Sequence, residues 1–299
     1  MRRIPKILHY TFGMEHDFGG KPWSLVHHVC LKSAIERLSP DAVFFYFEFE
    51  PTGAWWNLSR ELVTSVIIEA PREIFGRPLA HFAHRSDVVR LQKLIEYGGI
   101  YLDTDVIVHR HFDDLLGHSV VMGQEGEAAE HGLANAVILA EPQSPFLRRW
   151  LDQYGTFRGH GQEYFYAEHS VRLPAKLARE YPDEITVLPH TAFHWPLWTD
   201  SHLEWIFASN RKIPPGDSYA THLWQSYSWR RYLEDLTPGR VRFADTNFNR
   251  WAKPLVVGLP DDYGATPLAD RFWRLQKRAL KKARRVWGRA AGKREWDVR

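Results

Sequence analysis

Two aspartates, Asp103 and Asp105, are the residues of this sequence with the clearest potential for chemistry. They follow an apolar run at positions 98–102 (Gly-Gly-Ile-Tyr-Leu), which is typical of a turn leading into a buried strand. In a strand, side chains two positions apart point to the same face. Two adjacent carboxylates in an apolar place repel each other unless a cation offsets their charge. The pair therefore predicts a site for Mn²⁺ or Mg²⁺ shared with phosphate oxygens, with a solvated strand end as the alternative.

The segment before these aspartates predicts a helix from Ser86 to Tyr97. Ser86 suits the N-cap position, and the glycines at 98–99 suit the C-cap, where positive φ is favourable. Asp87 and Arg90 are three residues apart and share one face of this helix. That face either carries an ordinary ion pair exposed to solvent or is directed at the same cleft as the two aspartates.

Strand-like and helix-like segments alternate along the chain, which predicts an α/β fold with a mainly parallel central sheet. In such sheets ligands bind at the carboxyl ends of strands, where the aspartate pair is expected. Residues 55–68 are ambiguous between helix and strand. The expected strands are 4–10, 42–49, 100–108, 120–123, 133–140 and 185–188, and the other expected helices are 23–38, 145–154 and 164–178.

Composition limits the class of protein. At 299 residues with 44% hydrophobic content, the chain can bury the core of one large domain. The single cysteine, Cys30, excludes an intramolecular disulfide and favours a reducing compartment. No apolar run reaches the roughly 18 residues of a membrane span, and the N-terminus lacks the apolar segment of a signal peptide. We therefore expect a cytoplasmic protein.

The C-terminus differs in charge from the rest of the chain. Residues 271–299 contain twelve basic and two acidic residues, a net charge of +10, whereas residues 1–270 carry −7. Apolar residues recur there at helical spacing, which predicts a basic amphipathic helix. We expect one domain at 1–260 and a helical tail at 261–299. The tail would bind an anionic membrane surface, such as the inner face of the cell membrane, or an acidic partner, or else pack on the domain.

Two polar residues lie in other apolar segments. Asn135 comes early in the expected strand 133–140, where it is either a turn residue or a hydrogen-bonding group at a cleft. His222 lies on a short strand-like stretch followed by Trp224 and Ser228. A lone histidine is more often a structural residue, but its imidazole would suit the same cation site.

The string at 86–105 (Ser-Asp-x-x-Arg, then Tyr-Gly-Gly-x-Tyr-Leu-Asp-x-Asp) resembles the glycosyltransferase sugar-binding region containing the DXD motif, that is, family 32 glycosyltransferases. Segments 4–10, 133–137 and 219–229 resemble the family's opening strand, its asparagine motif and its closing His-x-Trp and Ser-Trp. The resemblance implies a GT-A type fold, a UDP- or GDP-sugar donor, Mn²⁺ or Mg²⁺, and retention of anomeric configuration. A glycan or glycolipid acceptor would follow, with no nucleic acid as partner.

The resemblance also implies roles for individual residues. Asp105 and His222 would bind the metal, together with Asp103. Asp87 would bind sugar hydroxyls, and Arg90 would bind the sugar or the diphosphate. The catalytic group would then consist of Asp103, Asp105, Asp87 and Arg90. The residues expected to contact the donor are Tyr10, Phe12, Asp87, Arg90, Asp103, Asn135, Trp224, Ser228 and Trp229.

The sequence departs from the family pattern at two places. Phe12 stands where a tryptophan is usual, which weakens the expectation of base stacking there. The Thr-Gly-Pro motif usually found after the asparagine motif is absent, and residues 164–169 (Tyr-Phe-Tyr-Ala-Glu-His) occupy the corresponding area. We therefore expect acceptor recognition in that area to be particular to this protein.

Two other functions fit parts of the sequence. A phosphohydrolase would use Asp103 as a nucleophile after a hydrophobic strand, but that motif normally lies near the start of its domain. A binding protein without catalysis would use the basic tail on nucleic acid or lipid, but the carboxylate pair would then have no explanation.

Overall fold

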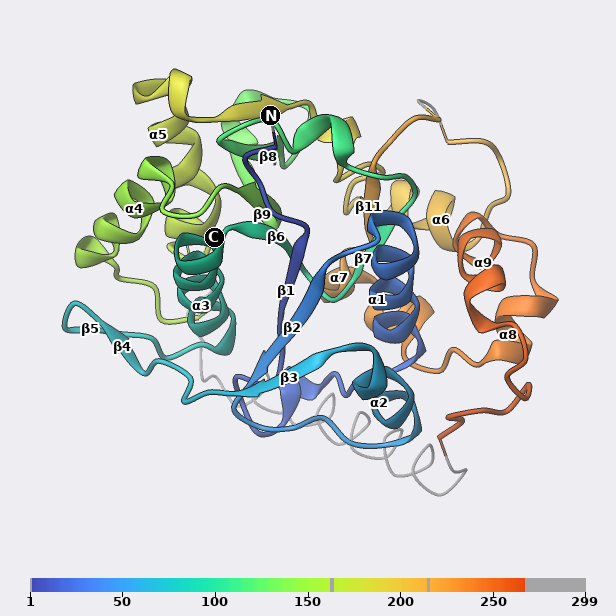
Figure 1. The fold of residues 1–299 in the computed structure, drawn as a ribbon. Helices are drawn as coiled ribbons and strands as arrows, with labels where there is room; N and C mark the ends of the chain where they lie inside the picture. The colour runs from blue at the N-terminus through green and yellow to red at the C-terminus, as the bar shows by residue number, and fades with distance from the viewer. Residues whose placement is uncertain (1, 162–163, 214–215, 267–299) are drawn as a thin grey trace, which may run out of the picture.

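The computed structural model describes residues 2–161, 164–213 and 216–266. Its centre is a seven-stranded sheet in the order β10-β8-β9-β6-β1-β2-β3 (Figure 1). In this sheet only β9 runs antiparallel to its neighbours, so the predicted α/β fold with a mainly parallel sheet is confirmed. The strands are β1 (Ile7–Thr11), β2 (Ala42–Phe47), β3 (Thr64–Ile67), β6 (Gly99–Leu102), β8 (Val120–Gln124), β9 (Leu133–Ala140) and β10 (Thr186–Leu188).

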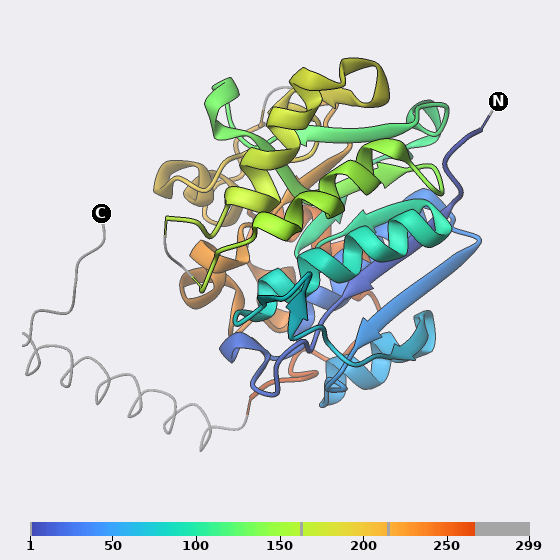
Figure 2. The same ribbon diagram turned by 90° about the vertical axis from the view of Figure 1, so that its left-hand side faces the viewer.

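Helices cover both faces of the sheet. One face packs against α1 (Leu25–Leu38) and α2 (Ala54–Ser59), and the other against α3 (Phe82–Tyr97), α4 (Pro145–Asp152) and α5 (Leu173–Glu180). Figure 2 shows α3 and α4 in front of the strands. Burial on both faces explains why the β2 segment is apolar almost throughout rather than at alternate positions.

Alternation along the central strands separates two cores. In β6, Ile100 and Leu102 point to the α1 side, whereas Tyr101 points to the α3 side. Tyr10 of β1 also faces the α1 side, and its side chain is completely buried. The polar Thr11 next to it therefore faces α3, where its hydroxyl meets that of Ser86 at 2.6 Å. This alternation places the hydroxyls of Thr11, Ser86 and Tyr101 together on the α3 side of the sheet.

The C-terminal part adds helices and a second, two-stranded sheet beside the first. In that sheet β7 (Val106–Val108) pairs antiparallel with β11 (Ala220–His222). No helix among the described residues has the length and apolar character needed to cross a membrane. The remaining elements are the hairpin β4 (Glu73–Ile74) and β5 (Arg77–Pro78) and the helices α6 (Asp200–Phe207), α7 (Gln225–Ser228), α8 (Pro238–Phe243) and α9 (Asn247–Ala252).

Two expectations about local structure are wrong. Helix α3 begins at Phe82 because the His81 side chain caps it by accepting from the N–H of Ala83, and Ser86 lies inside the helix with its hydroxyl bonded to Thr11. The β6 strand does not continue to residue 108; it ends at Leu102, and the chain turns before β7 joins the other sheet.

Other boundaries agree more closely with the sequence. The strand expected at 133–140 has those bounds, and the ambiguous stretch at 55–68 contains most of α2 and all of β3. The predicted amphipathic helix at 271–299 lies outside the described residues, so the division at residue 260 stays a prediction.

Gly99 gives a test of the turn between α3 and β6. Its φ is +115°, and an added Cβ would lie 2.4 Å from the carbonyl oxygen of Ile7. We expect Gly99→Ala to lower the free energy of unfolding by roughly 1–3 kcal/mol from the backbone conformation alone. Urea unfolding measures this. Gly155→Ala is the control, because a Cβ added there would meet no atom within 4 Å and its φ is not positive. Equal effects of the two substitutions would contradict the prediction.

Candidate functional site: an acidic cluster at the carboxyl edge of the sheet

The two DXD aspartates lie in a turn that joins the two sheets. The N–H of Asp103 donates to the carbonyl of Ala136 in β9 at 2.8 Å, and the N–H of Val106 donates back to the carbonyl of Asp103 at 3.1 Å. The carbonyl of Asp105 accepts from the N–H of Leu223, just after β11, at 2.9 Å. Backbone bonds to both sheets therefore fix the turn at the carboxyl end of β6.

The pairing of β7 with β11 brings His222 to this turn. His222 is opposite Val106 in the ladder, and its Nε2 atom lies 3.3 Å from Oδ1 of Asp105. Ligand atoms of Asp103, Asp105 and His222 all lie within 4.8 Å of one another. The structure thus brings together the three predicted metal ligands, Asp103, Asp105 and His222, which we call the acidic cluster. Two carboxylates and one imidazole are a donor set that fits a divalent cation.

The charges of this cluster support that assignment. Burial would raise the pKa of Asp105, but His222 and the N–H of Gln225 outweigh it and lower the pKa. Burial would lower the pKa of His222, but Asp105 outweighs it and raises the pKa. Asp105 and His222 therefore stabilise each other's charged forms. A divalent cation bound there would supply the positive charge in place of a proton on His222.

Arg90 lies at the centre of the neighbouring polar network on α3. Its guanidinium is 3.2 Å from Oδ1 of Asp87 and 3.3 Å from Oδ1 of Asp103, and it donates to the carbonyl of Asn135 at 2.7 Å. It also lies over the ring of Tyr101, 4.2 Å from the ring centre. Arg90 is 5% exposed. The predicted contact with the diphosphate is untested, and in this structure Arg90 holds two carboxylates in place.

Asp87 and Asn135 form one wall of the site. The side-chain amide of Asn135 donates to Oδ1 of Asp87 at 2.7 Å. Burial raises the pKa of Asp87, and Arg90 acts against that rise. The Asp103 side chain, at 27% exposure, is the more open of the two carboxylates that Arg90 contacts. Hydrogen-bonding groups from α3, β6 and β9 therefore meet at one edge of the sheet.

The residues predicted to close over the donor are packed in the structure. The indole N–H of Trp224 donates to the carbonyl of Pro196 at 2.7 Å, and its ring centre is 4.2 Å from that of His222. The hydroxyl of Ser228 donates to the carbonyl of Leu223 at 2.7 Å. The Trp229 ring stacks on His27. The expected contacts of these residues with a donor stay predictions.

The two aromatic residues of the opening segment that are expected at the donor site, Tyr10 and Phe12, differ in position. Tyr10 is completely buried in the core on the α1 side, and its hydroxyl has no hydrogen-bond partner among the described residues. Phe12 follows β1 at the same edge as Asp103 and is partly buried, with its ring stacked on Phe18. Donor contact stays a prediction for both, and Phe12 is the one at the edge where a ligand would bind.

Sequence reasoning missed several residues of this region. His27 on α1 and Gln225 on α7 connect to Asp105, although Gln225 lies inside the 219–229 string. Thr11 and Tyr101 join a chain of hydroxyls that ends on Oδ1 of Asp103. These are single polar residues in separate helices and strands, so no local pattern in the sequence could identify them.

Glu125 and Tyr166 also approach the acidic cluster. Glu125 follows β8, and burial raises its pKa to about 7 although His222 and Arg172 act against the rise. Burial raises the pKa of Tyr166 above its ordinary value, and Asp87 and Asp103 contribute to that rise. Tyr166 comes from the segment 164–169 that we connected with the acceptor, so the charges of Asp87 and Asp103 reach this segment.

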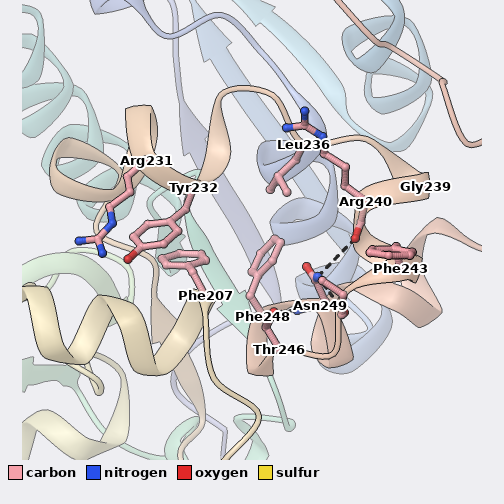
Figure 3. A pocket seen from close by; sticks show the side chains of 11 residues that line it. Phe207, Arg231, Tyr232, Leu236, Gly239, Arg240, Phe243, Thr246, Phe248 and Asn249 are labelled. Carbon is pink, nitrogen blue, oxygen red and sulfur yellow. Dashed lines mark hydrogen bonds between the residues drawn. The ribbon is translucent and has the colours of Figure 1, made fainter.

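A separate pocket lies among the C-terminal helices. Its volume is about 470 Å³, and Figure 3 shows that aromatic rings line it together with the side chains of Arg231 and Arg240. None of the predicted site residues lines this pocket, so the candidate chemistry belongs to the sheet edge. Its aromatic residues are Phe207, Tyr232, Phe243 and Phe248.

Arg90→Gln tests the buried charge network. The substitution leaves Asp87 and Asp103 without their shared cation, so we expect the free energy of unfolding to fall by about 3–5 kcal/mol. Denaturant unfolding at pH 7 measures the change. Arg149→Gln is the control, because its ion pair with Glu184 lies on the surface. A loss for Arg90→Gln no larger than that for Arg149→Gln would show that the network adds nothing to stability.

Glu125→Gln tests the pH dependence. Because the pKa of folded Glu125 is raised from 4.5 to about 7, its contribution to stability is present below pH 4.5 and is lost as the pH rises through 7. The amide variant carries no charge, so its stability relative to wild type should increase over this range by up to about 3 kcal/mol. Unfolding at several pH values with chelator measures this, and the exposed Glu127→Gln is the control. A difference that does not vary with pH would contradict the assignment.

The chain is similar to a known protein family and to several solved structures. The family model described as "Glycosyltransferase sugar-binding region containing DXD motif" matches residues 32–122, which include α3 and both aspartates. Among solved structures, "WbbM bifunctional glycosytransferase" is 12% identical with a TM-score of 0.49, covering 87% of this chain and 50% of that one. Glycosyltransferase GlyE of Streptococcus pneumoniae is 12% identical with a TM-score of 0.46, covering 76% of this chain and 57% of that one.

A curated relative is much more similar. "Glucan organizing enzyme 1" of Cryptococcus neoformans var. grubii is 37% identical over 270 residues, which cover 87% of this chain and 72% of that protein. The matched length includes the helix, the turn and the strands that build the acidic cluster. The chain therefore belongs to the family of glycosyltransferases whose sugar-binding region contains the DXD motif.

Proposed function

We propose that this glycosyltransferase of GT-A type fold moves a sugar from a UDP- or GDP-sugar to a hydroxyl group of a glycan, with a divalent cation and with retention of anomeric configuration. The observation that carries the proposal is the joining of Asp103, Asp105 and His222 at the carboxyl edge of the sheet. The hydrogen-bonding wall of Asp87 and Asn135 lies beside them and supports it.

The three ligand residues would hold Mn²⁺ or Mg²⁺. When bound, the cation would neutralise the charge that develops on the leaving diphosphate. Asp105 is held for this role by the N–H of Gln225 at 2.7 Å, and Asp103 by the hydroxyl of Tyr101 at 2.8 Å. Both carboxylates therefore start in fixed positions, which lowers the cost of organising the site.

Groups of this chain would bind and orient the donor sugar. Asp87, fixed by Arg90 and Asn135, would accept hydrogen bonds from sugar hydroxyls. We propose that Arg90 acts mainly by placing the two carboxylates, because its donors are already in use within the protein. The carboxylates would also favour an oxocarbenium-like transition state through their negative charge.

The transfer would proceed on one face of the sugar. The bond from the anomeric carbon to the diphosphate oxygen breaks, and a bond to the acceptor oxygen forms on the same face. The acceptor proton passes to the leaving phosphate oxygen. No carboxylate of the chain is assigned as a covalent nucleophile.

For the acceptor we propose a glycan or glycolipid. The name of the fungal relative refers to glucan, which agrees with a polysaccharide acceptor. Tyr166, whose pKa is raised in part by the charges of Asp87 and Asp103, belongs to the segment that would contact it. The basic residues at 271–299 would bind an anionic membrane surface, and we propose a cytoplasmic location on the inner face of the membrane.

The experiment that tests this function is a panel of UDP- and GDP-sugars incubated with Mn²⁺ and the full chain. We expect slow release of nucleotide from one donor by hydrolysis, and we expect a chelator to abolish it. Nucleotide release that is insensitive to chelator would contradict metal dependence. Hydrolysis of a simple aryl phosphate, abolished by Asp103→Asn, would instead favour the phosphohydrolase.

Asp105→Asn tests the metal ligand directly. The amide keeps the size of the side chain but loses the charge, so we expect donor turnover to fall by at least about 100-fold, because little of the cation's charge stabilisation is left. Asp152→Asn, an exposed carboxylate on α4, is the control and should leave turnover unchanged. Near wild-type, metal-dependent turnover by Asp105→Asn would show that the metal assignment is wrong.

A further inference from the structure

His27, on the first turn of α1, lies far from the DXD motif in the sequence but next to the acidic cluster in the fold. Its side chain is completely buried among aromatic rings. The ring centres of Trp23, Phe12 and Trp229 are 5.0, 5.4 and 5.8 Å from that of His27. Trp229 is one of the residues expected to close over the donor. His27 therefore packs directly against the segment 223–229, which we call the closing segment.

The hydrogen bonds of His27 determine its tautomer. The backbone N–H of Ser24 donates to Nδ1 of His27 at 3.0 Å, so Nδ1 is an acceptor without a proton. Burial lowers the pKa of His27 to about 4, so the ring is neutral at pH 7 and carries its proton on Nε2. In the structure the amide nitrogen of Gln225 lies 2.9 Å from Nε2. Two donors cannot bond to each other, so with the proton on Nε2 we assign the amide the opposite orientation, with its oxygen toward His27.

Gln225 continues this connection to the metal ligands. Its backbone N–H donates to Oδ2 of Asp105 at 2.7 Å. The residue before it, Trp224, has a left-handed backbone with φ +53° and packs against His222. One residue therefore contacts His27 through its side chain and Asp105 through its backbone. An unbroken series of hydrogen bonds joins the start of α1 to the acidic cluster.

We propose that His27 is a positioning residue that fixes the closing segment, and through Gln225 the carboxylate of Asp105, in the orientation that binds the metal and the donor. This inference rests on the proposed function, because it assigns His27 a part in the same site. The bond from His27 orients Gln225, and the Gln225 N–H then keeps Oδ2 of Asp105 in place, so that Oδ1 faces His222. Partners of this kind tune a site without touching the ion.

His28 is a matched control for a role limited to stability. It is the next residue of α1, it is 3% exposed, and burial likewise lowers its pKa to about 4. Its Nδ1 lies 2.9 Å from the hydroxyl of Ser59, and its ring packs near Trp55. These contacts are on α2 rather than at the acidic cluster. Loss of either imidazole should lower stability, but only His27 connects to the site.

The first experiment titrates Mn²⁺ alone into His27→Asn and His28→Asn variants of the full chain and follows binding by calorimetry. In His27→Asn, the side-chain oxygen can still accept from the N–H of Ser24, but the shorter side chain cannot reach the amide of Gln225. We expect His27→Asn to weaken Mn²⁺ binding by roughly 10-fold or more, as loss of an outer partner does at other metal sites. His28→Asn should bind as wild type does. Equal Mn²⁺ affinities for the two variants would overturn the proposal.

A double-variant comparison identifies the bond. Gln225→Leu removes the amide that His27 contacts but keeps the backbone N–H, and Gln225 is partly exposed, so the variant should fold. If the two residues act through one bond, His27→Asn combined with Gln225→Leu should weaken Mn²⁺ binding no more than the stronger single variant does. Effects that multiply would show that the residues act separately, and the proposal would fail.

Hydrogen exchange separates this inference from the proposed function. We expect amides of the closing segment, 223–229, to exchange at least about 5-fold faster in His27→Asn than in His28→Asn, with no metal or donor present, because local protection follows local contacts. If wild type does not bind Mn²⁺ but this difference is found, the metal assignment fails and the anchoring of the segment holds. If exchange is equal in the two variants, His27 does not fix the segment and the inference fails.

Discussion

The buried guanidinium of Arg90 between Asp87 and Asp103 is the interaction on which the wall formed by Asp87 and Asn135 depends. Each carboxylate comes from a different element, one from α3 and one from the turn after β6. Without the cation between them they would repel each other at low dielectric, and the start of α3 could not lie against the sheet edge. The same guanidinium bonds to the backbone of Asn135, so β9 is fixed by it as well.

The positions of Asp105 and His222 depend on a second constraint, the register between β7 and β11. Side chains alternate along a strand, so a shift of one residue would turn His222 away from Asp105 and break the ligand group. Backbone bonds on both sides of Asp105 hold this register, since its carbonyl accepts from Leu223 while its carboxylate accepts from Gln225. The three candidate metal ligands are thus placed by strand pairing, and the wall formed by Asp87 and Asn135 is placed by charge.

The sequence predicted the parts of this structure that local patterns determine. Apolar runs located the strands, and Asp-x-Asp after a Gly-Gly turn located the site, because both signals lie within a few residues. The N-cap was misplaced because Ser86 uses its hydroxyl in a tertiary contact with Thr11 that no local pattern reveals. His27 and Gln225 were missed for the same reason, since they meet across 198 positions of the chain.

The distance along the chain between the ligands of the acidic cluster has a consequence for the molecule as a whole. Asp105 and His222 belong to segments separated by more than a hundred residues, and the single, buried Cys30 leaves the chain with no disulfide bridge. A divalent ion bound by both would act as a reversible cross-link, favouring the folded state through its binding free energy. The free concentration of the cation would then determine how stably the two sheets are held together, as well as the fraction of molecules able to catalyse transfer.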